Sequence, residues 1–260
     1  MMNVLDAVFA EKKKNVLNIY CTAGFPLMES TTEVMLALQD AGADIIELGI
    51  PYSDPVADGP IIQQSNMQAL QNGITLTKIF EQLTQIKNRL HIPVVLMGYI
   101  NPVLQYGMEN FCKDAAACGV SGIILPDLPM YEFEKYYASI FKKYKLNCIF
   151  LISPSTSKER MKKADALSGG FLYAVSSSTT TGTQNSSENK INYFKKLAAA
   201  KFKNPLLIGF GIQDKTGFEE ACQYASGAII GSAFIKHIST AKNVQKAVKE
   251  FVHTIRPIEQ

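Results

Sequence analysis

The stretch VLNIYCTAGFPLMESTTEVMLALQDAGADIIEL, residues 16–48, decides the fold because it places two short apolar runs around one amphipathic segment. The runs Val16–Cys21 and Asp44–Leu48 have the length and the β-branched content of buried strands. The segment between them is long enough for a helix. Parallel strands need such a crossover, so the stretch predicts one βαβ unit.

The segment between the two runs carries its own start and stop signals. The residues STTE at 30–33 match a capping box, which opens a helix. Val34, Leu38 and Ala41 then fall on one apolar stripe, and Gly42 marks the end of the segment. The pattern predicts an amphipathic helix that covers one face of a sheet.

The same alternation continues along the chain. Six further strands are expected at Val94–Met97, Gly122–Leu125, Cys148–Ile152, Phe171–Val175, Leu206–Gly209 and Ala228–Ile230. A second capping box stands at Thr156–Glu159, and Asp214 is expected to cap a later helix. Eight units predict an α/β fold, a single-domain (β/α)8 TIM barrel over residues 1–260. An open doubly wound sheet is the alternative that periodicity leaves open.

Composition argues against several classes of protein. The net charge of +3 gives no argument for nucleic-acid binding. The five cysteines form no C-x-x-C pair, so a disulfide framework and a zinc site are not expected, and a reducing cytoplasm fits best. The apolar runs are too short to cross a membrane, and the N-terminus does not match a signal peptide. The stretch Ser176–Asn189, rich in Ser, Thr and Gly, is expected to be disordered.

The second expected strand leads into ELGIPYSDPVADGP, residues 47–60. In a barrel of this type the site lies at the carboxyl ends of the strands. If Ile45, Glu47 and Gly49 face the interior, Glu47 is a carboxylate in an apolar tube. Desolvation there raises its pKa, which suits a group that donates and accepts protons. Asp58, on the following loop, is expected to reach the same cavity.

Both acidic residues also have ordinary interpretations. A buried glutamate can be satisfied by the backbone or by a neighbouring base. An aspartate before Gly-Pro often shapes a turn or caps a helix, and a helix is expected to begin near Pro60.

Glycines follow the last two expected strands, as Gly209-Phe210-Gly211 and Gly231-Ser232. Glycine lets the backbone approach a ligand, helix-start amides favour anions, and these two loops often bind phosphate in barrels. The loops are therefore predicted to bind a phosphate group, with Gly182 adding a further amide, although Gly-x-Gly also serves ordinary turns. Tyr20, Tyr173 and Phe210, with Leu151, either line an apolar slot for an aromatic substrate or belong to the core.

Six segments, in this order, resemble the alpha subunit of tryptophan synthase. They are YCTAGFP (20–26), ELGIPYSDPVADGP (47–60), MGYINP (97–102), LPDLP (125–129), GFGI (209–212) and IIGSA (229–233). The resemblance spans nearly the whole chain. It implies a TIM-barrel lyase of tryptophan biosynthesis that splits indole-3-glycerol phosphate into indole and glyceraldehyde 3-phosphate by a retro-aldol reaction.

The resemblance also implies roles for individual residues. Glu47, Asp58 and Tyr173 take catalytic positions, with Glu47 serving indole C3 and the substrate hydroxyl and Asp58 serving the ring N1. The implied substrate-binding residues are Tyr20, Ile124, Leu151, Thr181, Gly182, Phe210, Gly211, Gly231 and Ser232. No cofactor and no metal are implied in this chain.

A partner is implied as well: a beta subunit that carries pyridoxal phosphate, in an α2β2 complex. The docking face implied by the resemblance comprises the Pro51–Asp54 loop, Asn101-Pro102 and Pro129, although proline loops are also simply rigid turns.

One segment departs from the commoner family pattern, Ser-Arg-x-Gly-Val-Thr-Gly. Here residues 176–182 read SSSTTTG, so that only the Thr181-Gly182 end survives. The altered loop is the feature that favours a non-catalytic subunit, which binds a phosphate ligand and activates a partner. Other phosphate-binding barrels are a further alternative, but they would lack the paired carboxylates.

Overall fold

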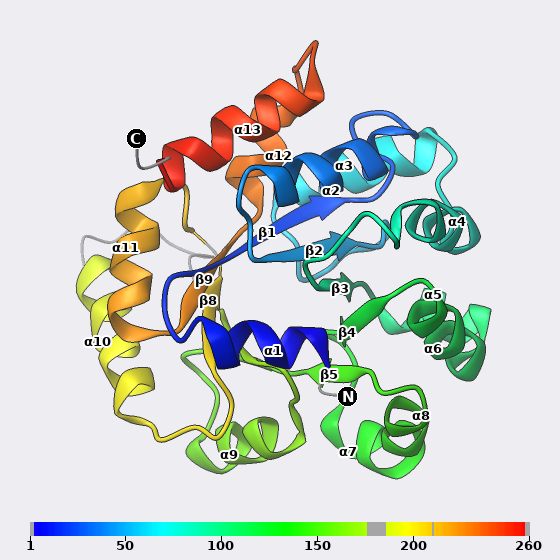
Figure 1. Cartoon of the computed structure of the whole chain (residues 1–260). Helices are drawn as coiled ribbons and strands as arrows, with labels where there is room; N and C mark the ends of the chain where they lie inside the picture. The colour runs from blue at the N-terminus through cyan, green and yellow to red at the C-terminus, as the bar shows by residue number, and fades with distance from the viewer. Residues whose placement is uncertain (1–2, 176–185, 210, 258–260) are drawn as a thin grey trace.

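The computed structural model describes residues 3–175, 186–209 and 211–257, with the side chains of 186–189 left out. Short parallel strands form a central barrel, and helices surround it (Figure 1). The strands are β1 (Val16–Thr22), β2 (Ile45–Gly49), β3 (Val94–Met97), β4 (Val120–Ile124), β5 (Asn147–Ile149), β6 (Leu151–Ile152), β7 (Leu172–Val175), β8 (Leu206–Gly209) and β9 (Gly227–Ile230).

The strand order β5-β4-β3-β2-β1-β9-β8-β7-β6 closes the sheet on itself, because its two ends are consecutive in the chain. Only Phe150 separates β5 from β6. Its carbonyl accepts from the Tyr173 N–H of β7 (3.1 Å), but its N–H donates to Ser168 Oγ (3.0 Å) and not to a neighbouring strand. The fifth expected strand is thus present in two halves. The predicted TIM barrel is confirmed, and the open doubly wound sheet is wrong.

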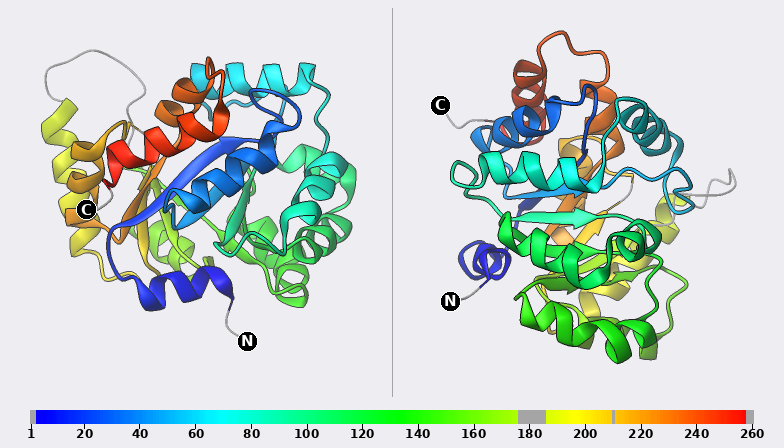
Figure 2. Two further views of the ribbon diagram at one scale, coloured as in Figure 1. Left: turned by 45° about the horizontal axis from the view of Figure 1, so that its top comes forward. Right: turned by 90° about the vertical axis from the view of Figure 1, so that its right-hand side faces the viewer.

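Helices follow the strands and cover the outside of the barrel (Figure 2). They are α2 (Ser30–Asp40), α3 (Pro60–Gln71), α4 (Leu76–Ile86), α5 (Ile100–Tyr106), α6 (Met108–Ala117), α7 (Met130–Glu132), a π-helical turn (Phe133–Tyr137), α8 (Ala138–Lys143), α9 (Lys158–Leu167), α10 (Ser186–Ala199), α11 (Lys215–Tyr224), α12 (Ser232–Ile238) and α13 (Val244–Ile255). Helix α2 buries the expected stripe of Val34 and Leu38 and ends before Gly42, whose φ of 92° suits glycine.

Helix α1 (Val4–Glu11) lies across the amino ends of the strands (Figure 1). Its Leu5 is fully buried against Gly122 of β4 and Gly170 beside β7; a Cβ would collide with the leucine at Gly170 and would be in tight contact with it at Gly122. The preceding Asn3 donates to the carbonyls of Ser121 (2.9 Å) and Lys145 (3.0 Å). The amino end of the barrel is therefore covered.

An ion cluster fixes the chain ends to this side of the barrel. Asp44 accepts from the Leu17 N–H (2.7 Å), from Lys12 Nζ (2.8 Å) and from Arg256 Nη2 (2.8 Å). Arg256 also donates to the Gly42 carbonyl (2.6 Å), which joins the end of α13 to the entry of β2.

Both predicted capping boxes are wrong in detail. At the start of α2, the Ser30 and Thr31 hydroxyls accept from the N–H groups of Leu27 and Gly24, so they hold the preceding loop. At α9 the cap is Ser157, which accepts from the Arg160 N–H (3.2 Å). The expected cap at Asp214 is confirmed by its bond from the Gly217 N–H (2.9 Å).

The expected disorder over Ser176–Asn189 is wrong for its last four residues, because α10 begins at Ser186. The other ten residues, 176–185, lie outside the described part of the chain.

A pair of glycine substitutions tests the barrel packing. A Cβ at Gly227 of β9 would lie 2.0 Å from the Val16 carbonyl oxygen of β1, a backbone atom that cannot move aside. We expect Gly227→Ala to lower the free energy of unfolding by about 1–3 kcal/mol or more. The control Gly217→Ala, in the first turn of α11, meets no atom closer than 3.5 Å. It should stabilise the protein by up to about 1 kcal/mol. Urea unfolding measures both, and equal stabilities would contradict this account.

Candidate active site

Glu47 lies in the middle of β2 with its side chain inside the barrel. It is 1% exposed and stands opposite Tyr20 of β1 and Val95 of β3 in the strand register. Its Oε2 accepts from Asn18 Nδ2 at 3.1 Å. Its Oε1 is buried and has no hydrogen-bond partner among the described residues. The interpretation of Glu47 as a fully satisfied buried glutamate therefore does not hold for the described part of the chain.

Burial raises the pKa of Glu47 to about 8. The hydrogen bond from Asn18 opposes this rise, and the nearby charge of Asp58 adds to it. Near neutral pH the side chain is therefore mostly protonated. A neutral carboxylic acid in an apolar cavity is equipped to donate a proton.

Asp58 lies on the loop between β2 and α3 and is only partly buried. Burial raises its pKa to about 6, while hydrogen bonds from the Tyr99 and Asn66 side chains lower it. Tyr99 Oη also accepts from the Ala57 N–H (3.0 Å), which holds the loop in place. Asp58 is thus mostly ionised at the pH at which Glu47 is mostly protonated, so the two carboxyls are in different states.

One ordinary interpretation of Asp58, that it caps α3, is wrong. The helix begins at Pro60, where one was expected, and its cap position is Gly59, with no side-chain cap bond. The turn at this point is closed by the Asp58 N–H, which donates to the Pro55 carbonyl (3.1 Å). The carboxylate accepts instead from the Tyr99 and Asn66 side chains.

Two tyrosines complete the cluster, each lying over a glycine of the neighbouring strand. A Cβ at Gly49 would lie 2.1 Å from Tyr20 Oη, and one at Gly209 would lie 2.4 Å from the Tyr173 ring. The pKa of each tyrosine is raised well above its ordinary value, mainly by burial and also by the charges of Glu47 and Asp58. The structure therefore brings Glu47, Asp58, Tyr20 and Tyr173 together, from opposite sides of the barrel.

The remaining described residues of the predicted site lie at the carboxyl ends of the strands. Ile124 ends β4 and is fully buried, and Leu151 begins β6, paired with Tyr173. Gly211 follows β8 with a φ of 77°, and Gly231 packs beside the Tyr20 Cβ and leads into Ser232 of α12. Thr181, Gly182 and Phe210 lie outside the described residues.

Three residues of the cluster were not predicted from the sequence: Asn18, Asn66 and Tyr99. Asn18 had a signal, since it is the polar residue inside the apolar run VLNIYC and lies two positions from Tyr20. Asn66 sits on α3 and Tyr99 just before α5, and only the fold brings them to Asp58.

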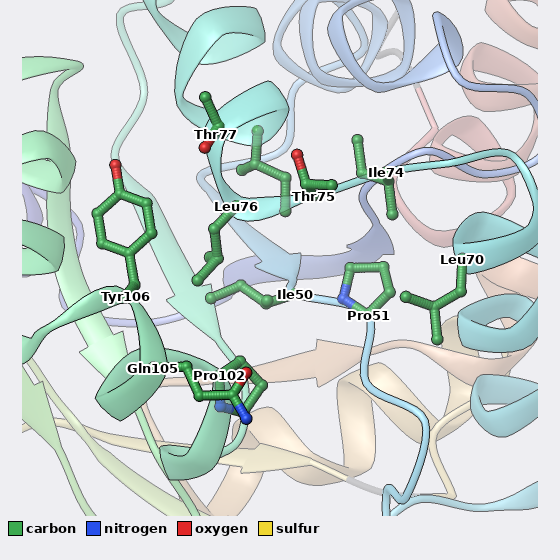
Figure 3. A pocket seen from close by; sticks show the side chains of 11 residues that line it. Ile50, Pro51, Leu70, Ile74, Thr75, Leu76, Thr77, Pro102, Gln105 and Tyr106 are labelled. Atoms are coloured by element: carbon green, nitrogen blue, oxygen red, sulfur yellow. The ribbon is translucent and has the colours of Figure 1, made fainter.

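A cavity of about 330 Å³ opens outside the barrel wall, between α4, α5 and the start of the β2–α3 loop (Figure 3). Ile50, Pro51, Leu76, Pro102 and Tyr106 are among its lining residues. It contains neither Glu47 nor Asp58, so it is separate from the carboxyl pair.

A metal is not implied by the described side chains, among which no three His, Cys, Asp or Glu residues are grouped as a metal would require. Over the same residues, none of the helices has the length and apolar character needed to traverse a bilayer.

A parallel barrel with a mostly protonated carboxyl in its interior and a mostly ionised one on a strand-end loop has the groups that a barrel enzyme needs for proton transfer. Comparison with known proteins gives the family. The sequence model of the family described as "Tryptophan synthase alpha chain" matches residues 7–260. The chain belongs to this family. It is a lyase of tryptophan biosynthesis, acting on indole-3-glycerol phosphate.

Individual relatives agree with this assignment. The tryptophan synthase alpha chain of Bacteroides thetaiotaomicron is 46% identical, over 95% of this chain and 97% of its own length. That of Flavobacterium psychrophilum is 46% identical, over 98% and 100%. The crystal structure of the alpha chain from Legionella pneumophila subsp. pneumophila has a TM-score of 0.87 at 35% identity, covering 98% of this chain and 97% of that one.

The protonation of Glu47 can be tested through stability. Its pKa in the folded protein, about 8, lies above the ordinary 4.5, so the folded state keeps a proton that the unfolded chain loses above pH 4.5. The wild-type protein therefore loses stability as the pH rises from 4.5 to 8, by up to about 1.4 kcal/mol per pH unit. The Glu47→Gln variant has no titrating carboxyl at this position, so it does not lose stability in this way. In urea unfolding across this range, the free energy of unfolding of the variant should rise relative to that of the wild type as the pH increases. A difference between the two proteins that does not change with pH would refute the raised pKa of Glu47.

Proposed function

We propose that Glu47 and Asp58 divide the proton transfers by which this chain cleaves indole-3-glycerol phosphate into indole and glyceraldehyde 3-phosphate. The observation that carries the proposal is one cluster with two carboxyls whose environments give them different pKa values, about 8 and about 6. Such a difference allows one group to act as an acid while the other stays ionised at the same pH.

The chemistry requires both groups. Indole is a poor carbanion leaving group until its C3 carbon is protonated, which places a positive charge on the ring. Glu47 donates that proton to C3, and ionised Asp58 stabilises the charge at the ring N1–H. Glu47, now a carboxylate, takes the proton of the hydroxyl on the adjacent carbon. The carbon–carbon bond breaks, its electrons restore the aromatic ring, and the aldehyde forms, so that Glu47 ends in its starting state.

The rest of the predicted site supplies binding. Gly211, Gly231 and Ser232 follow two neighbouring strands, where backbone N–H groups can meet a phosphate. Thr181 and Gly182 join them by their match to the family. The rings of Tyr20 and Phe210, with Ile124 and Leu151, bind the indole, and Tyr173 lies beside the two carboxyls. The phosphate group is remote from the bond that breaks, and binding it orients the reacting carbon.

The cleavage needs no cofactor in this chain, because the protonated indole ring itself accepts the electrons of the broken bond. Pyridoxal phosphate belongs to the beta partner in this proposal. The five cysteines are all free and buried, which is compatible with a reducing cytoplasm.

We further propose that the beta subunit docks on three neighbouring loops, in an α2β2 complex. Tyr52 of the Pro51–Asp54 loop stacks near Tyr99, with ring centroids 5.3 Å apart, and accepts a hydrogen bond from Asn101 Nδ2 (3.3 Å). The Asp127 carboxylate, two residues before Pro129, accepts from the Ile100 N–H (2.9 Å). These contacts make the three loops one continuous face. Val56, 87% exposed, adds an apolar side chain to it.

Two substitutions test the catalytic assignment. Incubation of the purified chain with indole-3-glycerol phosphate should release free indole, and Glu47→Gln and Asp58→Asn should each lower kcat by at least about 100-fold. Binding of a non-cleavable indole alkyl phosphate should stay within about threefold, since the phosphate loops are unchanged. The control Glu109→Gln removes an exposed carboxylate paired with Lys143 and should be silent. Near-normal turnover in either site variant would remove that residue from catalysis.

Val56→Asp tests the docking face. A buried unpaired charge is costly, so we expect the substitution to weaken association with the beta subunit at least tenfold. Val4→Asp is the matched control: Val4 is also exposed, but it lies on α1 at the other end of the barrel. Sedimentation velocity of each mixture gives the affinity and, for the wild type, the stoichiometry. Equal weakening by both variants, or by neither, argues against docking at these loops.

A further inference from the structure

We propose that Asn18 is a positioning residue that fixes which oxygen of Glu47 transfers the proton. The inference rests on the proposed cleavage reaction and concerns the same site. Asn18 lies in the middle of β1, fully buried, and stands opposite Ile45 in the register. Since side chains alternate along a strand, Asn18 and Tyr20 face the same interior as Glu47.

The amide of Asn18 makes one defined contact with the carboxyl. Nδ2 can only donate, and it donates to Glu47 Oε2 at 3.1 Å. Oε2 therefore acts as an acceptor, and since a carbonyl oxygen accepts better than a hydroxyl oxygen, the contact favours the acid form with its proton on Oε1. Because Oε1 is buried without a hydrogen-bond partner among the described residues, its O–H is free to meet a bound substrate. Asn18 thus selects Oε1 as the oxygen that donates to C3 and later receives the hydroxyl proton.

A purely structural role for Asn18 fits the observations less well. A buried amide costs free energy unless its polar atoms are paired, and Asn18 Oδ1 has no partner in the described part of the chain. A leucine of similar volume would fill the same space without that cost. Over the described residues, the contact with Glu47 is the one hydrogen bond that the Asn18 side chain makes, and it is the reason for an amide here.

The surroundings of Glu47 make this contact consequential. Among the described residues, the titratable groups near enough to interact with its charge are Tyr20 and Cys21 of β1, Tyr173 of β7 and Asp58 of the β2–α3 loop. None of these groups is a cation. The hydrogen bond from Asn18 is the influence that stabilises the ionised carboxylate, against burial and the charge of Asp58. Loss of the amide should therefore raise the pKa of Glu47 further.

Asn18→Leu removes the donor and keeps the volume, whereas Asn18→Ser keeps a polar atom but moves the donor back by one bond, out of reach of Glu47 Oε2. Glu47 must be protonated to act, so kcat/KM declines above its pKa, near pH 8 in the wild type. With a higher pKa the acid survives to higher pH. We expect this alkaline limb to move up by about one to two pH units. We also expect kcat to fall about tenfold to 100-fold, because the carboxyl loses its fixed orientation, with KM within about twofold.

The matched control is Asn147→Leu. Asn147 of β5 makes the same type of bond at the same length, from Nδ2 to Asp6 Oδ1 at 3.1 Å, but at the amino end of the barrel. It should leave kcat and the pH profile unchanged. If either Asn18 variant folds and keeps both the wild-type kcat and the wild-type alkaline limb of the pH profile, the proposal is overturned. If instead the wild type releases no indole, or Glu47→Gln stays active, the failure lies with the proposed function itself.

A measurement on the wild type needs no variant. In a nuclear magnetic resonance titration, the Asn18 side-chain amide signals should shift with the same midpoint as the Glu47 carboxyl carbon, since the two groups are bonded. An Asn18 amide that does not respond while Glu47 titrates would overturn the proposal. This result can be obtained even if both Asn18 variants fail to fold.

Discussion

The interior of the barrel is apolar, and the energetic cost of placing a carboxyl there governs the site. Glu47 is surrounded by strands that are buried along almost their whole length, and it receives one hydrogen bond from Asn18. The protein tolerates the group largely by keeping it neutral. A neutral acid in an apolar environment is poor for folding and useful for donating protons, so the cost in stability and the chemical capability have the same origin.

The second carboxyl, that of Asp58, has a different environment. Asp58 comes from a loop, is partly open, and receives hydrogen bonds from Tyr99 and Asn66. These donors favour its charged form, although burial still raises its pKa. The two acids differ because a strand fixes one inside the wall and a loop presents the other at the rim. The barrel thereby gives two carboxyl groups different protonation states within one cluster.

Much of this arrangement could be predicted from the sequence. The eight apolar runs gave the barrel, and the alternation of Ile45, Glu47 and Gly49 placed Glu47 on the interior face. The helix caps were less predictable, because hydroxyls such as those of Ser30 and Thr31 can bond to either the helix or the loop before it. Tyr99 and Asn66 could not be linked to Asp58 at all, since their proximity depends on how α3 and α5 pack around the barrel.

Helix α1 gives the barrel a single functional opening in the part of the chain described. With Leu5 packed against Gly122 of β4 and Gly170 just before β7, the amino end of the interior is sealed. Reactant, products and water molecules must all cross the opposite rim, where the strand-end loops stand. Whatever protein covers that rim therefore decides where a small uncharged product goes, and it does so without touching either acid.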